Sequence, residues 1–189
     1  MSHAAAETTQ PVNPVTALSI ADLQARIRDI PDFPEPGIMF RDITPLLADA
    51  ASFRAVVDKM AAPFRGQADV VVAIESRGFI LGAPIAYALG AGLALVRKPG
   101  KLPFTVESEA YTLEYGSNTL EIHRDAVTPG QRVLLVDDLL ATGGTVRAAA
   151  NLVARLGGEI VGVCVLAELS ALNGRALLTD LPVTSFIVY

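Results

Sequence analysis

The sequence predicts an α/β fold in which a parallel sheet is covered by helices on both faces. Apolar, β-branched runs such as Val133–Val136 alternate along the chain with segments of helical periodicity such as Val146–Leu156. Polar turns follow three of these runs, at residues 75–78, 97–101 and 137–145. Because ligands of such sheets bind outside the carboxyl ends of the strands, we expect the three turns to share one rim and to form a binding site there.

Length and composition favour one globular domain. The chain has 189 residues, of which 51% are hydrophobic, enough for a substantial core. Residues 1–17 are largely polar or small and have no sustained periodicity, so we expect a flexible tail before a single domain at 18–189. The only cysteine, Cys164, lies in an apolar run and is expected in the core, where it can form no disulfide within the chain.

Charge and hydropathy argue against several classes of partner. The net charge of −5 does not suit a nucleic-acid-binding surface. No apolar run is long enough to cross a bilayer, so we expect no membrane partner and a cytoplasmic location. The pattern GxxxxGK[ST] does not occur, which excludes a P-loop nucleotide hydrolase.

The remaining elements follow from local signals. Ser19, with Asp22 three residues later, predicts a capped helix over 19–30 that Pro31 ends. Residues 31–45 are too rich in proline for regular structure and too apolar for a solvated linker, which indicates a stiff loop that either covers a ligand or is pinned to the core. Further helices are predicted at 51–64, 79–89 and 170–178, further strands at 69–74, 92–96, 119–123, 159–169 and 184–189, and a β-hairpin at 102–118.

The stretch 133–145, VLLVDDLLATGGT, has the layout of an anion site. A buried strand leads into a turn of small residues and then into a helix, whose first backbone amides have no partner within the helix. Glycines let the backbone approach a ligand closely, and the two threonines add hydroxyl donors. The residues of this turn are Ala141, Thr142, Gly143, Gly144 and Thr145.

Two carboxylates, Asp137 and Asp138, precede the turn and would repel a ligand that carried only phosphate. They suit a ligand that also has vicinal hydroxyl groups, because carboxylates accept hydrogen bonds strongly from hydroxyls and can hold a divalent cation through its water. A ribose 5-phosphate combines these two features. The ordered string of strand, acids and glycine turn therefore predicts a sugar-phosphate site.

The same stretch resembles the phosphoribosyl pyrophosphate signature of the type I phosphoribosyltransferases. Three other segments are similar to those of family members that act on adenine: 31–45, the motif YTLEYG at 111–116, and Glu168-Leu169 with Leu172, Gly174 and Arg175. The similarity spans most of the chain after the tail. It implies the parallel-sheet type I phosphoribosyltransferase fold with helices on both faces, an N-terminal hood at about 31–45 and a β-hairpin flap at about 102–118.

The resemblance also implies how a purine would be held. In the hood, the base would stack on Phe40 and be read by main-chain groups of Met39 and Arg41. Main-chain donors and acceptors suit this role, because a purine edge offers both kinds of group in one plane. In the flap, Glu114 would face N7 of adenine as the catalytic carboxyl, and its neighbour Tyr115 would also contact the substrate.

Two polar turns are matched to the pyrophosphate. Glu75 and Ser76 lie in the loop that holds it in the family, where Glu75 replaces a more common aspartate and a non-proline cis peptide is expected at Glu75–Ser76 or Ser76–Arg77. Arg77 would act in catalysis by stabilising the leaving group. Three cations of the next turn, Arg97, Lys98 and Lys101, would bind the substrate, and Arg97 and Lys101 are expected to reach into the site of a homodimer partner.

The implied reaction transfers the phosphoribosyl group of 5-phosphoribosyl 1-pyrophosphate to N9 of adenine, giving AMP and pyrophosphate. Mg²⁺ is the expected cofactor, carried on the pyrophosphate without direct protein ligands and reached by Asp137 and Asp138 through water. Two alternatives stay open from the residues alone: transfer to another purine base, or a non-catalytic regulator that binds 5-phosphoribosyl 1-pyrophosphate.

Overall fold

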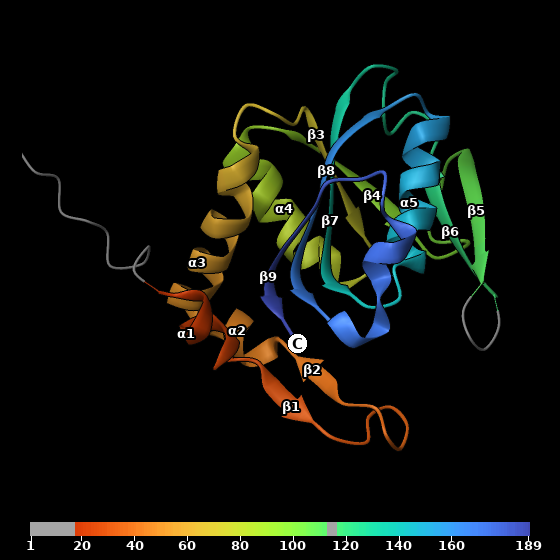
Figure 1. Ribbon diagram of the computed structural model, residues 1–189. Helices are drawn as coiled ribbons and strands as arrows, with labels where there is room; N and C mark the ends of the chain where they lie inside the picture. The colour runs from red at the N-terminus through yellow and green to blue at the C-terminus, as the bar shows by residue number, and fades with distance from the viewer. Residues whose placement is uncertain (1–17, 113–116) are drawn as a thin grey trace, which may run out of the picture. The chain divides into compact units, whose positions relative to one another are not determined.

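The computed structural model describes residues 18–112 and 117–189 (Figure 1), so the predicted tail at 1–17 and the flap residues Glu114 and Tyr115 lie outside the described residues. The described chain forms two compact units that meet between Ala55 and Val56. Helix α3 (Ala50–Ala61) spans the boundary and is followed by the 3₁₀ turn η2 (Ala62–Phe64).

The first unit contains α1 (Ile20–Gln24), the antiparallel pair β1 (Arg28–Ile30) and β2 (Phe40–Asp42), and α2 (Thr44–Ala48). The predicted capping box is present, because the Ser19 hydroxyl accepts from the Asp22 amide at 3.1 Å while the Asp22 carboxylate accepts from the Ser19 amide at 2.8 Å. The predicted extent of this helix was wrong: it ends at Gln24, and residues 28–30 pair with β2 instead.

The second unit is built on a seven-stranded sheet in the order β5-β6-β4-β3-β7-β8-β9. Strands β4, β3, β7, β8 and β9 are parallel, as predicted, and the β5–β6 hairpin joins the edge antiparallel to β4. The elements of this unit are β3 (Val70–Ile74), α4 (Arg77–Leu89), β4 (Gly92–Arg97), β5 (Val106–Thr112), β6 (Ser117–His123), β7 (Arg132–Leu140), α5 (Gly144–Arg155), β8 (Glu159–Glu168), η3 (Ser170–Leu172), η4 (Gly174–Leu177) and β9 (Val183–Val188).

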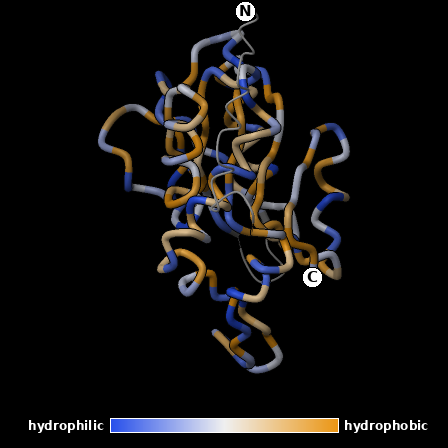
Figure 2. Tube along the Cα trace, turned by 90° about the vertical axis from the view of Figure 1, so that its left-hand side faces the viewer, coloured by the Kyte–Doolittle hydropathy of each residue, from blue (hydrophilic) through white to orange (hydrophobic). Residues whose placement is uncertain are grey.

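Helices α4 and α5 cover opposite faces of this sheet (Figure 1), and the side chains of β3 point alternately towards the two helices. A Cβ placed on Gly82 of α4 would lie 2.5 Å from the Cβ of Ala73, so α4 packs closely on that face. Val70, Val72 and Ile74 point the other way, into a core that includes Leu152 of α5. Figure 2 shows the corresponding hydrophobic colour along the strands in the middle of the trace.

Two boundaries differ from the sequence prediction in ways that affect the site. Strand β7 continues through Leu140, so Asp137 lies within the paired part of the strand, opposite Val165 of β8, and not after its end. The predicted helix 170–178 is instead the two 3₁₀ turns η3 and η4, because Asn173 between them has a left-handed backbone with φ of 51°.

Cys164 is buried in β8, as predicted for a core residue. Burial raises the pKa of its thiol to about 12, so the reactive thiolate is scarce at neutral pH. None of the described helices is both long and apolar enough to span a bilayer.

Candidate active site

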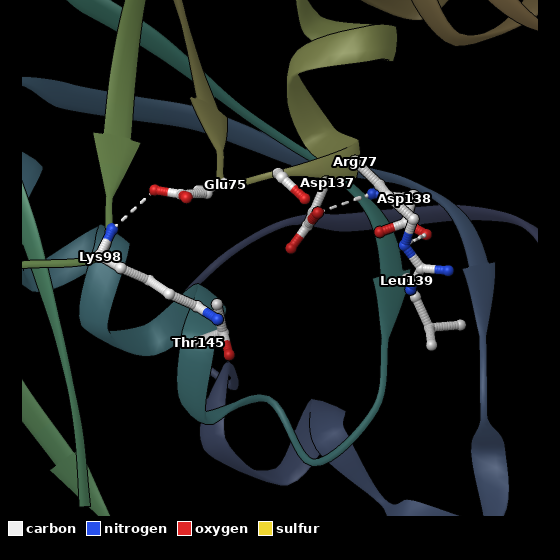
Figure 3. Close-up of a pocket in the computed structure, with 8 residues that line it drawn as sticks. Glu75, Arg77, Lys98, Asp137, Asp138, Leu139 and Thr145 are labelled. Atoms are coloured by element: carbon white, nitrogen blue, oxygen red, sulfur yellow. Dashed lines mark hydrogen bonds and ion pairs between the residues drawn. The ribbon is translucent and has the colours of Figure 1, made fainter. Parts of the chain in front are cut away.

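The carboxyl ends of β4, β3 and β7, which are neighbours in the sheet, converge on one cavity of about 310 Å³ (Figure 3). Each of the three strands is followed by one of the predicted polar turns, and all three turns contribute side chains. The cavity is lined by Glu75, Ser76, Arg77, Lys98, Asp137, Asp138, Leu139 and Thr145. The sequence had predicted this convergence from the strand ends alone.

The glycine turn links β7 to α5, which begins at Gly144. Gly143 has a φ of 86°, and a Cβ there would lie 2.4 Å from the backbone oxygen of Gly174. Only glycine can adopt this positive φ without strain and also fit this close to Gly174 without a shift of the backbone. The first amides of the twelve-residue α5 therefore remain available to an anion, with the Thr145 side chain at the cavity and Thr142 exposed beside it.

Asp137 and Asp138 are 9% and 6% exposed and lie next to each other at the cavity. The Asp138 amide donates to Asp137 Oδ1 at 2.9 Å, and Arg77 Nε lies 3.0 Å from Asp138 Oδ2. Burial raises the pKa of Asp137 well above its usual value, and the neighbouring Asp138 charge raises it further. Burial also raises the pKa of Asp138, although Arg77 opposes that shift. Such a pair favours ligands that bring hydroxyl donors or a cation.

Glu75 holds the two turns that follow β3 and β4 together. Its carboxylate accepts from the Lys98 amide at 2.9 Å and from Arg97 Nε at 3.2 Å. Burial by itself would raise the pKa of Glu75, but these two donors outweigh it and hold the pKa below its usual value. Figure 3 shows the Lys98 side chain extended towards Thr145, across the cavity from Asp138. The peptide bond Glu75–Ser76 is cis, as the resemblance had implied.

Arg97 and Lys101 are not among the residues that line the cavity. The Arg97 guanidinium is held inside its own unit, by Glu75, by the Lys101 carbonyl at 3.2 Å and over the Phe79 ring at 5.8 Å. Lys101 itself is exposed. Their expected reach into a partner's site stays a prediction.

The three hood residues are described within the first unit. Phe40 begins β2 and meets the Phe33 ring edge-on, with 5.0 Å between ring centroids. Met39 is 44% exposed, and Arg41 forms an ion pair with Asp29. The contact between Phe33 and Phe40 agrees with a loop that is packed by its own side chains, and base stacking on Phe40 stays a prediction.

Three residues of the site were not predicted from the sequence as functional. Leu139 lines the cavity, but an apolar side chain directly after the acid pair gave no signal for a functional role. Tyr111 of β5 places its hydroxyl 3.2 Å from Thr145 Oγ1, although only its membership of the YTLEYG motif had been noted. Gly174 packs against the glycine turn from a segment about thirty residues away, a contact that only the three-dimensional structure reveals.

The donor set at the cavity suits a metal ion that arrives with its substrate. Mg²⁺ commonly binds through one or two carboxylates together with substrate phosphates and water. Asp137 and Asp138 can supply such carboxylates. Within residues 18–112 and 117–189, no group of three or more His, Cys, Asp or Glu side chains is placed to hold a metal.

We expect Asp137→Asn to stabilise the free protein while it weakens ligand binding. Because the pKa of Asp137 is raised by folding, the native state keeps this proton where the unfolded chain has lost it, and the free energy of unfolding falls as pH rises above 3.8. Asparagine removes this pH-dependent loss of stability, so the Tm of Asp137→Asn should exceed that of the wild type by an amount that grows with pH. Each kcal/mol of added stability should raise Tm by about 2–4 °C. Thermal unfolding between pH 5 and pH 8 measures it.

The matched control is Asp69→Asn. Asp69 is another aspartate of this sheet, immediately before β3, but hydrogen bonds from Arg132 lower its pKa to about 2. Its loss should therefore lower Tm at neutral pH and leave ligand binding unchanged. A Tm for Asp137→Asn that is no higher than that of wild type at pH 8 would contradict the account of the buried acid pair.

Comparison with known proteins places the chain in a family. Residues 45–180 match the phosphoribosyl transferase domain family. The chain is 57% identical over 171 residues to the adenine phosphoribosyltransferase of Myxococcus xanthus, covering 90% of this chain and 93% of the relative. It is 54% identical over 171 residues to that of Synechocystis, covering 89% and 99%.

Solved structures agree with the fold. Adenine phosphoribosyltransferase from Thermoanaerobacter pseudethanolicus superimposes with a TM-score of 0.88 at 49% identity, covering 90% of this chain and all of that one. The enzyme from Saccharomyces cerevisiae, in complex with D-2,5-dideoxy-2,5-imino-altritol 1,6-bisphosphate and adenine, gives 0.85 at 35% identity, with 88% and 97% covered. The type I phosphoribosyltransferase fold is thereby confirmed. With its glycine turn, its acid pair and these relatives, the chain belongs to the adenine phosphoribosyltransferases of the phosphoribosyl transferase domain family.

Proposed function

We propose that the chain transfers the phosphoribosyl group of 5-phosphoribosyl 1-pyrophosphate to N9 of adenine, releasing AMP and pyrophosphate. The observation that carries this proposal is the glycine turn 141–145 directly beside the buried pair Asp137 and Asp138, in a chain 57% identical to an adenine phosphoribosyltransferase. The turn and the helix start suit a 5-phosphate, and the acid pair suits the two ribose hydroxyls.

The other cavity residues suit the leaving group. As C1′ loses pyrophosphate, positive charge develops on the sugar ring and negative charge on the departing oxygens. Asp137 and Asp138 would favour the cationic ring, while Arg77, Lys98 and the amides after the cis peptide at Glu75–Ser76 would stabilise the pyrophosphate. Binding of the remote 5-phosphate would fix C1′ in the reactive position, so that binding energy is used for orientation.

Base recognition is assigned to the hood and the flap. We assign stacking of adenine to Phe40 and reading of its edge to main-chain groups of Met39 and Arg41. Glu114 would face N7 and assist loss of the N9 proton through the ring, and Tyr115 would close against the substrate. Both segments would also keep water away from the reactive sugar.

Three finer assignments belong to the same proposal. Mg²⁺ would neutralise charge on the pyrophosphate, and Asp137 and Asp138 would contact the ion through its bound water. The active form would be a homodimer in which Arg97 and Lys101 approach the partner's site. A cytoplasmic location would place the enzyme with its substrates in purine salvage.

The test is a direct one. The protein is incubated with Mg²⁺, 5-phosphoribosyl 1-pyrophosphate labelled in the ribose, and adenine, hypoxanthine, guanine or xanthine in turn, and the nucleotide products are separated. We expect AMP from adenine, and at least about 100-fold lower kcat/KM for the other bases, because a site that hydrogen-bonds one purine edge leaves polar groups unpaired with another. Rapid IMP, GMP or XMP formation would contradict adenine as the substrate, and no product from any base would contradict transfer altogether.

A further inference from the structure

We propose that the segment 168–180 is a buttress for the glycine turn, and that Arg175 and Arg147 are positioning residues for the sugar phosphate. This rests on the proposed function, since it concerns how the same site is held. Neither arginine lines the cavity. Both act through the backbone contact between Gly174 and residues 141–143.

The contact between the turn and the buttress is backbone against backbone. A Cβ on Gly143 would lie 2.4 Å from the Gly174 oxygen, and a Cβ on Gly174 would lie 2.2 Å from the Ala141 oxygen and 3.0 Å from the Gly143 nitrogen. The only side-chain atom among these nearest neighbours is Leu140 Cδ1, 3.1 Å from a Cβ on Gly174, and the closer atoms are all backbone. A shift of η4 would therefore move the amides of the turn.

Arg175 fastens η4 to the carboxyl end of β8 and to the first half of β9. Its Nε lies 2.8 and 3.0 Å from the two carboxylate oxygens of Glu168, and its Nη2 donates to Glu168 at 2.8 Å and to Ser185 Oγ at 2.9 Å. Its Nη1 donates to the Val183 carbonyl at 3.1 Å. Glu168 is only 7% exposed, and its hydrogen bonds with Arg175 hold its pKa below the usual value. Because the guanidinium is planar and its acceptors are fixed, the Arg175 side chain is held in a single position.

Arg147 fastens the other side of the turn. It lies in the first turn of α5, and its amide donates to the Gly143 carbonyl at 2.9 Å. Its Nε donates to the Leu177 carbonyl at 2.8 Å, and its guanidinium pairs with Asp180. The Leu169 amide also donates to the Leu140 carbonyl at 2.9 Å. The glycine turn is thus tied to the buttress before and after the Gly143–Gly174 contact.

A matched control pair exists in the same unit. The Arg132 guanidinium donates two hydrogen bonds to Asp69, of 3.0 and 2.6 Å, and its Nη1 also donates to the Gly66 carbonyl at 2.8 Å. These residues lie at the amino ends of β7 and β3, away from the cavity rim. Arg132 has similar contacts but no link to the glycine turn. Comparing its replacement with that of Arg175 therefore separates a positioning effect from a general loss of stability.

The test compares Arg175→Gln with Arg132→Gln in the full chain. Arg175→Gln should raise the Kd for AMP, measured by calorimetry, and the KM for 5-phosphoribosyl 1-pyrophosphate, each by about 10-fold. A less preorganised glycine turn binds the phosphate more weakly, and the loss is the same in the ground state and in the transition state. The kcat at saturation should change less than about threefold. Arg132→Gln should lower Tm without changing Kd, KM or kcat. Arg175→Lys should recover part of the affinity.

A second readout does not depend on activity. In amide NMR spectra of the ligand-free protein, Arg175→Gln should shift the resonances of Gly143 and Gly144, and Arg132→Gln should not. Should Arg175→Gln fail to fold, Arg147→Gln takes its place with the same expectations. Unchanged glycine resonances, together with an AMP Kd no different from that of Arg132→Gln, would overturn the buttress. If the wild type forms no AMP, the proposed function fails, while the resonance shifts still decide the buttress.

Discussion

Replacement of Glu114 by alanine should lower kcat for AMP formation by about 100- to 10,000-fold, the range typical of a positioned acid–base group. Adenine can attack C1′ only as its N9 proton is lost, and a carboxyl at N7 would assist that loss through the ring. The affinity for 5-phosphoribosyl 1-pyrophosphate should stay within about twofold, because the interaction lies in the transition state and not in the sugar-phosphate site. Steady-state kinetics at saturating adenine, with a binding titration, measures both.

Glu107→Ala is the control for this prediction. Glu107 is a carboxylate of the same hairpin, but it lies near the start of β5 and pairs with the exposed Arg124 at 2.9 Å. Its loss should leave kcat unchanged, since an exposed pair of this kind contributes little. If Glu114→Ala retains the wild-type kcat, Glu114 has no catalytic role.

Gly143→Ala should weaken AMP binding by about 100-fold or more, equivalent to the loss of one or two hydrogen bonds to a charged group. Alanine is strained at a φ of 86°, and its Cβ would lie 2.4 Å from the Gly174 oxygen, so the turn must move away from the buttress. The amides would then no longer converge on the phosphate. Calorimetric titration with AMP measures the effect, and thermal unfolding shows how much of the fold remains.

Gly92→Ala supplies the comparison. Gly92 begins β4 with an ordinary backbone, and a Cβ there would meet nothing closer than 3.6 Å. We expect AMP binding and Tm close to those of the wild type. Wild-type AMP affinity in Gly143→Ala would mean that the glycine turn does not hold the phosphate.

The parallel part of the fold could be predicted because its signals are local. Runs such as Val70–Ile74 and Val133–Val136 are short, β-branched and apolar, and each leads into a polar turn and a helix, a pattern with few alternative arrangements. The rule that ligands bind at the carboxyl ends of parallel strands then predicts that Glu75, Lys98 and Asp137 lie together, and all three line the cavity.

The errors arose where a distant pairing outweighed the local signal. Residues 28–30 fit a helical pattern, but their backbone pairs with Phe40–Asp42, ten residues further on. The segment 170–178 has helical composition, yet Asn173 adopts a left-handed conformation that ends η3 and lets Gly174 reach the glycine turn. Arg147 gave no signal in the sequence, and Arg175 was noted only within a segment similar to the family's. The positioning role of both was not predicted, because their acceptors are backbone carbonyls and carboxylates on other elements.

The most direct measurement is a crystal structure of the protein with AMP bound. We expect the 5-phosphate within hydrogen-bond distance of the backbone amides between Gly143 and Thr145, and the ribose 2′- and 3′-hydroxyls on Asp137 and Asp138. A nucleotide bound elsewhere, or one turned so that its base rather than its phosphate occupies the glycine turn, would contradict this expectation.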